Sequence, residues 1–209
     1  MSKPFCTALI ALAIVAIPLA TIAGDPPSTN AHLLAYTADG KLILPANYRE
    51  WVYLSSGLGM SYNPKALASP NPMFDNTFVN PEAYRAFRNT GTWPDKTVIV
   101  LEVRGSSDKG SIIKRGHFQS GDVQGMEVHV KDTARFNGGW AFFSFDDSPA
   151  PAKQIPTTEA CYSCHAAHGA VDTTFVQFYP TMLPIAKQHA TLSAAYLKDE
   201  ADRIKTAGN

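Results

Sequence analysis

The chain has 209 residues, which suits a single domain, and 45% of them are hydrophobic, enough for a sizeable core. Its formal net charge is zero, so the sequence gives no sign of a nucleic acid partner or of binding to an anionic membrane surface. It has 3 cysteines: Cys6 near the N-terminus, and Cys161 and Cys164 late in the chain. If the N-terminal segment is removed, no further thiol is left for a structural disulfide.

The N-terminus has the pattern of a signal peptide. Lys3 supplies a positive charge, an apolar run covers about residues 8–20, and small residues follow. The run is too short for a comfortable membrane span, although an uncleaved N-terminal anchor stays open as an alternative. We therefore expect residues 1–23 to be a signal peptide, the protein to be periplasmic, and residues 24–40 to be a flexible lead-in.

Helical signals occur near both ends of the chain. Asn47 is a suitable N-cap for a helix over residues 48–54, and Pro81 fits the first position of a helix that stops before Gly91. Between them, the glycine- and proline-rich residues 55–76 predict a long loop. Further helices are expected from an N-cap at Thr157 to Gly169, over residues 173–182 and over residues 191–205.

Strand signals fill the middle of the chain. Residues 97–104 are dominated by β-branched side chains, and residues 126–131 alternate between apolar and polar. Other strands are expected at residues 42–45, 76–80, 117–119, 123–131 and 140–145. Because strands follow strands with short turns, the pattern predicts an α+β fold, with an antiparallel β-sheet flanked by helices.

Residues 161–165 read Cys-Tyr-Ser-Cys-His, the C-x-x-C-H spacing of a covalent c-type haem site. Thiols at Cys161 and Cys164 lie on one helical turn, where both can add to the vinyl groups of one haem, and His165 follows in position to bind the iron. A disulfide, half of a zinc site and a redox dithiol are the alternatives. Zinc would need a second pair of ligands, and a redox dithiol needs no adjacent histidine. The motif predicts one haem c, bound on a C-terminal helix.

The second axial position of that haem is predicted to be open, because the motif lies late in the chain, unlike in the class I electron carriers. The candidate ligands that would close it are Met60, Met73, Met126, Met182, His32, His117, His129, His168 and His189. Phe74, Phe78 and Phe87 are expected to cover the open side and to admit small uncharged ligands. Phe175, Phe178 and Tyr179 are also available to pack on the haem. A six-coordinate electron-transfer cytochrome stays open as an alternative.

Several blocks in this order resemble the cytochrome P-460 family. They are YREW (48–51), NPEAY (80–84), GTWPDKTVIV (91–100), KDTARF (131–136), GGWAFFSF (138–145), CYSCH (161–165) and FVQFYP (175–180). The resemblance covers about residues 42–184. It implies a periplasmic, β-rich protein, usually homodimeric, with one c-type haem. We also expect a periplasmic redox partner. We expect the haem domain over residues 41–190 and a helical tail over residues 191–209.

Members of this family that oxidise hydroxylamine carry a lysine crosslinked to the haem, whereas the related cytochromes c′-beta lack it and bind gases such as nitric oxide. In this chain the expected position of that lysine falls at about Leu101, and no lysine occurs between Thr97 and Lys109. Glu127 lies in a block that resembles the family's Gly-Leu-Glu, where a carboxylate can relay protons; a solvent-facing glutamate is the alternative. The sequence therefore predicts nitric oxide binding, with oxidation of hydroxylamine or nitric oxide as the alternative.

Overall fold

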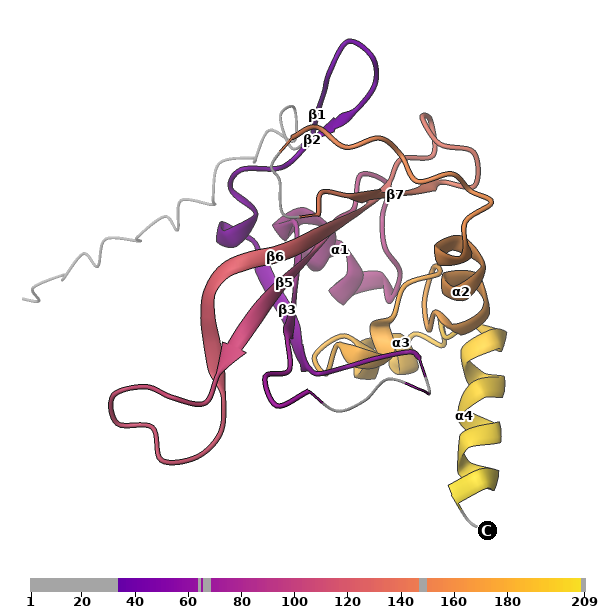
Figure 1. The fold of residues 1–209 in the computed structure, drawn as a ribbon. Helices are drawn as coiled ribbons and strands as arrows, with labels where there is room; N and C mark the ends of the chain where they lie inside the picture. The colour runs from indigo at the N-terminus through magenta and orange to yellow at the C-terminus, as the bar shows by residue number, and fades with distance from the viewer. Residues whose placement is uncertain (1–33, 64, 66–68, 147–149, 208–209) are drawn as a thin grey trace, which may run out of the picture. The chain divides into compact units, whose positions relative to one another are not determined.

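A five-stranded antiparallel sheet is the centre of the fold (Figure 1). The computed structural model describes residues 34–63, 65, 69–146 and 150–207. Neighbouring strands in the sheet are also neighbours in the sequence. They are β3 (Val52–Leu58), β4 (Phe74–Val79), β5 (Val98–Ser107), β6 (Phe118–Lys131) and β7 (Trp140–Ser144). Together with the helices this confirms the α+β class, whereas the predicted signal peptide and most of the predicted lead-in lie outside the described residues.

The other elements precede, interrupt or follow these strands. Strand β1 (Ala35–Tyr36) pairs with β2 (Leu42–Ile43) in a second sheet. The helices are η2 (Tyr48–Glu50), α1 (Pro81–Thr90), α2 (Ala160–His168), η3 (Val176–Phe178), α3 (Leu183–Gln188) and α4 (Ala194–Ala207), where η marks a short 3-10 helix. Within the described part of the chain, none of them is long and apolar enough to cross a membrane.

Helix α1 begins and ends where the sequence predicts. Pro81 occupies its first turn, where the missing N–H costs no hydrogen bond. Gly91 ends it with a φ of 73°, a left-handed conformation that glycine adopts without a steric penalty. Between these ends, Ala83 and Phe87 are buried and pack the helix against the sheet.

The predicted helix over residues 48–54 is wrong. The chain makes only the turn η2 there and then continues as β3, in which Val52 pairs with Val79 of β4. Trp51 and Leu54 are buried as expected, but Leu58, at the end of the strand, is 48% exposed. Pairing with β4 satisfies the backbone hydrogen bonds of this segment, although its local sequence also suits a helix. As a result, the long loop predicted over residues 55–76 is shorter and covers residues 59–73.

Three other elements differ from their predicted ranges. The two strands expected at residues 117–119 and 123–131 are one strand, β6, because its irregular pairing with β5 continues through the polar residues between them. The helix expected over residues 173–182 is reduced to η3. Helix α2 begins at Ala160, later than predicted, but it ends at Gly169 as expected.

The sheet separates two hydrophobic clusters, because successive side chains of a strand point to opposite faces. The back face, defined here by Val100 and Val128, packs against β2, η2 and the segment that follows β7. The front face, defined by Ile99 and Phe142, packs against α1, α3 and the chain that follows α2. The pocket described below lies on this front face.

Candidate functional site

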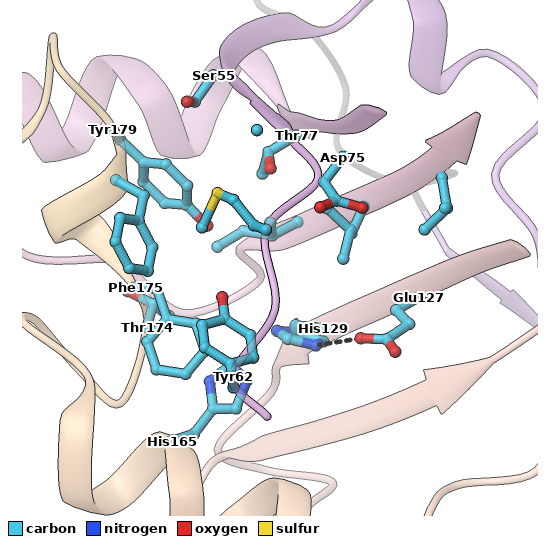
Figure 2. Close-up of a pocket in the computed structure, with 16 residues that line it drawn as sticks. Ser55, Tyr62, Asp75, Thr77, Glu127, His129, His165, Thr174, Phe175 and Tyr179 are labelled. Carbon is cyan, nitrogen blue, oxygen red and sulfur yellow. Dashed lines mark ion pairs between the residues drawn. The ribbon is translucent and has the colours of Figure 1, made fainter. Parts of the chain in front are cut away.

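A cavity of about 300 Å³ lies between the front face of the sheet and the chain that follows α2 (Figure 2). Its volume is at the lower end of the range for ligand pockets. The sheet contributes the side chains of Asp75, Thr77, Ile99, Leu101, Val103, Glu127 and His129, and the opposite wall contributes His165, Thr174, Phe175, Phe178 and Tyr179. The cavity therefore joins residues from the middle of the chain to the helix that carries the C-x-x-C-H motif.

Helix α2 presents His165 of the motif to this cavity. Cys161 and Cys164 are both free thiols one helical turn apart; Cys161 is exposed and Cys164 partly exposed. The next residue, His165, lines the cavity, and its ring stacks on Phe175 with 4.2 Å between ring centroids. Two accessible thiols on the helix whose His165 lines the cavity fit the three bonds that a c-type haem requires.

The hydrogen bond of His165 fixes which ring nitrogen is free. Its Nδ1 lies 2.7 Å from the carbonyl oxygen of Thr173, and because a carbonyl only accepts, Nδ1 carries the hydrogen and donates. Burial, with a smaller contribution from His129, lowers the pKa of His165 to about 4. The ring is therefore neutral at pH 7, and Nε2 keeps the lone pair with which a histidine binds a metal.

His129 lies next to His165. The two ring centroids are 4.9 Å apart in a T-shaped contact. On its other side His129 reaches Glu127, with 3.8 Å between Nε2 and Oε2, and this contact lowers the pKa of Glu127 (Figure 2).

Leu101 and Glu127, two residues singled out in the sequence, are direct partners across the β5–β6 pair. Thr77 pairs with Leu101 on its other side, so the three residues form one row across the front face. Burial, and then the negative charge of Glu127, raise the pKa of the nearby Asp75. The apolar β5 side chains are thus flanked by polar ones, and the wall is mixed where the sequence predicts an apolar one.

The three phenylalanines expected over the haem lie elsewhere. Phe74 and Phe78 occupy positions of β4 that face the back of the sheet, where Phe78 packs edge-on against Tyr48 at 5.7 Å. Phe87 is completely buried on α1, against Trp93. The alternation of side chains along β4 and the packing of α1 against the sheet turn all three side chains away from the cavity.

Aromatic side chains do line the cavity, but from another part of the chain. Phe175, Phe178 and Tyr179, expected to pack on the haem, belong to its wall. Tyr62, which the sequence did not single out, joins them from the loop between β3 and β4 and contacts Phe175 at 5.6 Å. A tyrosine in a glycine- and proline-rich loop carries no signal of its own.

Of the methionines and histidines considered as second axial ligands, Met60 and His129 line the cavity. Met60 lies over Gly57, where an added Cβ would meet its sulfur atom. Met126 faces the back of the sheet and Met182 is fully buried in the front cluster. His168 instead contacts Asp199 of α4, and His32 lies outside the described residues.

The family model for cytochrome P-460 matches residues 45–176, more than half of the chain. The chain belongs to the cytochrome P-460 family. Membership implies a haem cofactor, and the matched region contains both strands of the Leu101–Glu127 pair as well as the motif on α2. A comparison with curated proteins found no match.

Proposed function

We propose that this protein is an exported, periplasmic cytochrome with one c-type haem, whose front-face cavity binds a small ligand such as nitric oxide. The observation that carries the proposal is the position of His165, whose free Nε2 adjoins a cavity with Leu101 in its other wall. Cys161 and Cys164 would hold the haem by thioether bonds and His165 by its iron. Export agrees with this, because bacteria attach haem covalently outside the cytoplasm.

The bound haem would supply an iron with one position for an exogenous ligand. The residues of the chain decide what reaches it. Ile99, Leu101 and Val103 give the wall an apolar centre that favours small uncharged molecules over water. Leu101 also stands where the hydroxylamine-oxidising members of the family are expected to have their crosslinking lysine. These features favour the cytochrome c′-beta type of activity.

A second candidate function is oxidation of hydroxylamine or nitric oxide, and Glu127 is the observation that favours it. Its carboxylate lines the cavity next to Leu101, and its side chain is 52% exposed, so it can exchange protons with solvent. In this role Glu127 would accept a proton from the substrate. Turnover of hydroxylamine with an artificial electron acceptor, abolished by Glu127→Gln, would favour the enzyme over the ligand-binding protein.

Covalent attachment is tested by the mass of the denatured protein. The double variant Cys161→Ala/Cys164→Ala should lose all covalently bound haem, whereas Ser163→Ala, a matched substitution between the two cysteines on α2, should keep it. Haem that stays attached without both motif cysteines would contradict the proposed linkage. The mass of the exported protein also reports whether residues 1–23 have been removed.

The absorption spectrum of the ferrous protein tests the open coordination site. A five-coordinate iron gives a broad, high-spin spectrum, and a sharp low-spin pair of α and β bands would instead indicate a protein ligand such as Met60. A strongly red-shifted Soret band would indicate a crosslink to the macrocycle. Leu101→Lys should create such a crosslink if Leu101 occupies the position of the missing lysine.

We also propose the homodimer that the family resemblance implies, and a periplasmic redox partner. Sedimentation of the haem-loaded protein at several concentrations tests the dimer. Reduction by a small periplasmic electron carrier, followed by stopped-flow absorbance, tests the partner.

A further inference from the structure

The loop between α2 and η3 has a backbone that is unusual for its sequence. Asp172 and Thr173 have φ values of 48° and 59°, the left-handed region that side chains other than glycine rarely adopt. For Thr173 this is exceptional, because its branched side chain crowds the backbone in that conformation. Such a conformation persists only where the surroundings impose it. Its result is that the Thr173 carbonyl points at Nδ1 of His165.

Two elements distant in the sequence hold this loop in place. The backbone N–H of Trp93 and Nζ of Lys131 both donate to Oδ2 of Asp172, at 3.0 and 3.1 Å. The indole N–H of Trp93 donates to Oγ1 of Thr174, at 2.8 Å. The residues on both sides of Thr173 are therefore anchored to the same tryptophan.

The anchoring contacts are shielded and mutually connected. Trp93 is 2% exposed, and the side chains of Lys131 and Asp172 are 17% and 30% exposed. Nζ of Lys131 also donates to the carbonyl oxygen of Trp93, at 2.7 Å, which links the two anchors to each other. Charge-assisted hydrogen bonds in a shielded position are stronger and more directional than the same bonds in water.

We propose that Trp93, Lys131 and Asp172, called here the proximal clamp, are positioning residues that set how strongly His165 binds the haem iron. They act through the Thr173 carbonyl and touch neither the iron nor its ligand. The inference rests on the proposed function in one respect, namely that His165 is the iron ligand.

The physical link is the hydrogen bond from Nδ1 of His165 to Thr173. A well-aligned acceptor at Nδ1 draws the proton away from the ring and makes Nε2 a stronger electron donor. A stronger donor stabilises ferric over ferrous iron and strengthens the iron–nitrogen bond. Loosening the clamp should therefore raise the reduction potential of the haem and weaken the bond to His165.

The test compares the haem-loaded protein with variants of the clamp. Lys131→Met removes the ammonium group but keeps most of the side-chain volume, and Asp172→Asn removes the charge but keeps an acceptor for Trp93. We expect the iron–histidine stretching band of the ferrous protein, read by resonance Raman, to move to lower frequency and the reduction potential to rise, more in Lys131→Met than in Asp172→Asn. Lys131→Arg, which keeps a cation at this position, should have a band frequency and a reduction potential close to those of the wild type.

The matched control is Lys109→Met, which removes an exposed lysine from the connection between β5 and β6 and should leave the band and the potential unchanged. If Lys131→Met does not fold, Asp172→Asn decides the question. Wild-type values of both the band and the potential in the folded clamp variants would overturn the proposal.

A second measurement, on haem-free protein produced without the haem-attachment machinery, separates this proposal from the proposed function. Nitrogen NMR shifts of the His165 ring should show hydrogen fixed on Nδ1 in the wild type and a mixture of the two tautomers in Lys131→Met. A fixed tautomer in both proteins would overturn the clamp even if His165 binds haem. A wild type that takes up no haem would contradict the proposed function, while the tautomer shift would still support the clamp.

Discussion

The two faces of the β5–β6 strand pair are built from alternate residues and serve different ends. On the front, Leu101 and Glu127 line the cavity and stay partly accessible. On the back, their sequence neighbours Val100 and Val128 are completely buried in a hydrophobic cluster. A shift of a single residue along either strand therefore separates a position that lines the cavity from a position buried in the hydrophobic cluster.

The back face also contains a charge that the cavity does not use. Glu102 is completely buried on β5 and forms ion pairs with Arg49 and Arg104, while Tyr48 donates a further hydrogen bond to its carboxylate. Burial alone would raise the pKa of Glu102, but the hydrogen bonds from Arg104, Tyr48 and Arg49 outweigh it and lower the pKa to about 2. This network joins η2 to the centre of the sheet.

The largest effect is expected at Glu102. Glu102→Gln should destabilise the fold by about 3 kcal/mol, because it leaves Arg104 largely buried without its counter-charge. Urea denaturation at pH 7 measures this change. Ligand binding by the protein that remains folded should be unaffected, since Glu102 faces away from the cavity.

The same variant has a distinct pH dependence. The carboxylate has an ordinary pKa of 4.5 and a folded-state pKa of about 2, so its contribution to stability is present above pH 4.5 and disappears as the pH falls towards 2. Glu102→Gln should lack this part of the acid sensitivity. Equal acid sensitivity in variant and wild type would show that Glu102 is not the group that titrates.

The next largest effect is expected at Val128, whose contribution to stability can be compared with that of its neighbour Glu127 on the other face of β6. Val128→Ala should cost about 2 kcal/mol, from lost burial and the cavity that remains. Its neighbour Glu127 is half exposed, so Glu127→Gln should change the free energy of unfolding by less than about 0.5 kcal/mol. Thermal denaturation of the two variants compares them directly, and similar losses would contradict the division between the faces.

On the front face, Leu101→Phe should act on the ligand and not on the fold. The larger ring fills part of the cavity, so we expect the affinity for nitric oxide or carbon monoxide to fall about tenfold, or about 1.4 kcal/mol. Stopped-flow absorbance of the ferrous protein gives the association and dissociation rates, whose ratio is the affinity. Phe74→Leu, on the back of β4, is the control, and reduced binding there would revive the prediction that Phe74 covers the haem.

The smallest effect is expected at Asp75. Its pKa is raised by burial and by Glu127, so the folded state holds the proton more firmly than the unfolded chain does. The charged form is therefore unfavourable in the fold, and stability falls as the pH rises through the raised pKa. Asp75→Asn should stabilise the protein at pH 7 by less than about 1 kcal/mol, and the gain should vanish near pH 3. A stability loss at pH 7 would mean that Asp75 makes a favourable contact as a carboxylate.

The sequence was most informative where a clear alternation of apolar and polar residues runs along part of a strand. The alternation over residues 126–131 correctly predicted a buried face, and its polar members Glu127, His129 and Lys131 all lie on the front, where they serve the cavity or the clamp. Asp75 was missed because the predicted strand began at residue 76, although Asp75 and Thr77 follow the same alternation on β4.

Where local signals conflicted, tertiary contacts decided the outcome. Residues 48–54 suit a helix by spacing, but pairing with β4 makes them a turn and a strand. Phe87 was expected over the haem because it lies on the helix that was expected, with the preceding loop, to cover it. Its helix instead turns it into the front cluster against Trp93.

The sequence by itself determined the features that depend on a few consecutive residues. These are the two thiols and the histidine on one helical turn, the ends of α1 at Pro81 and Gly91, and the alternation of buried and polar side chains at the end of β6. Only the tertiary structure decided the acceptor that fixes the His165 tautomer and the contacts that hold it. Thr173 adopts a conformation that its own sequence disfavours, and it does so because Trp93 and Lys131, about 80 and 40 residues away, hold the residues on either side of it. The strength of the proposed iron ligand is therefore a property of the fold, and the motif shows only which residue that ligand is.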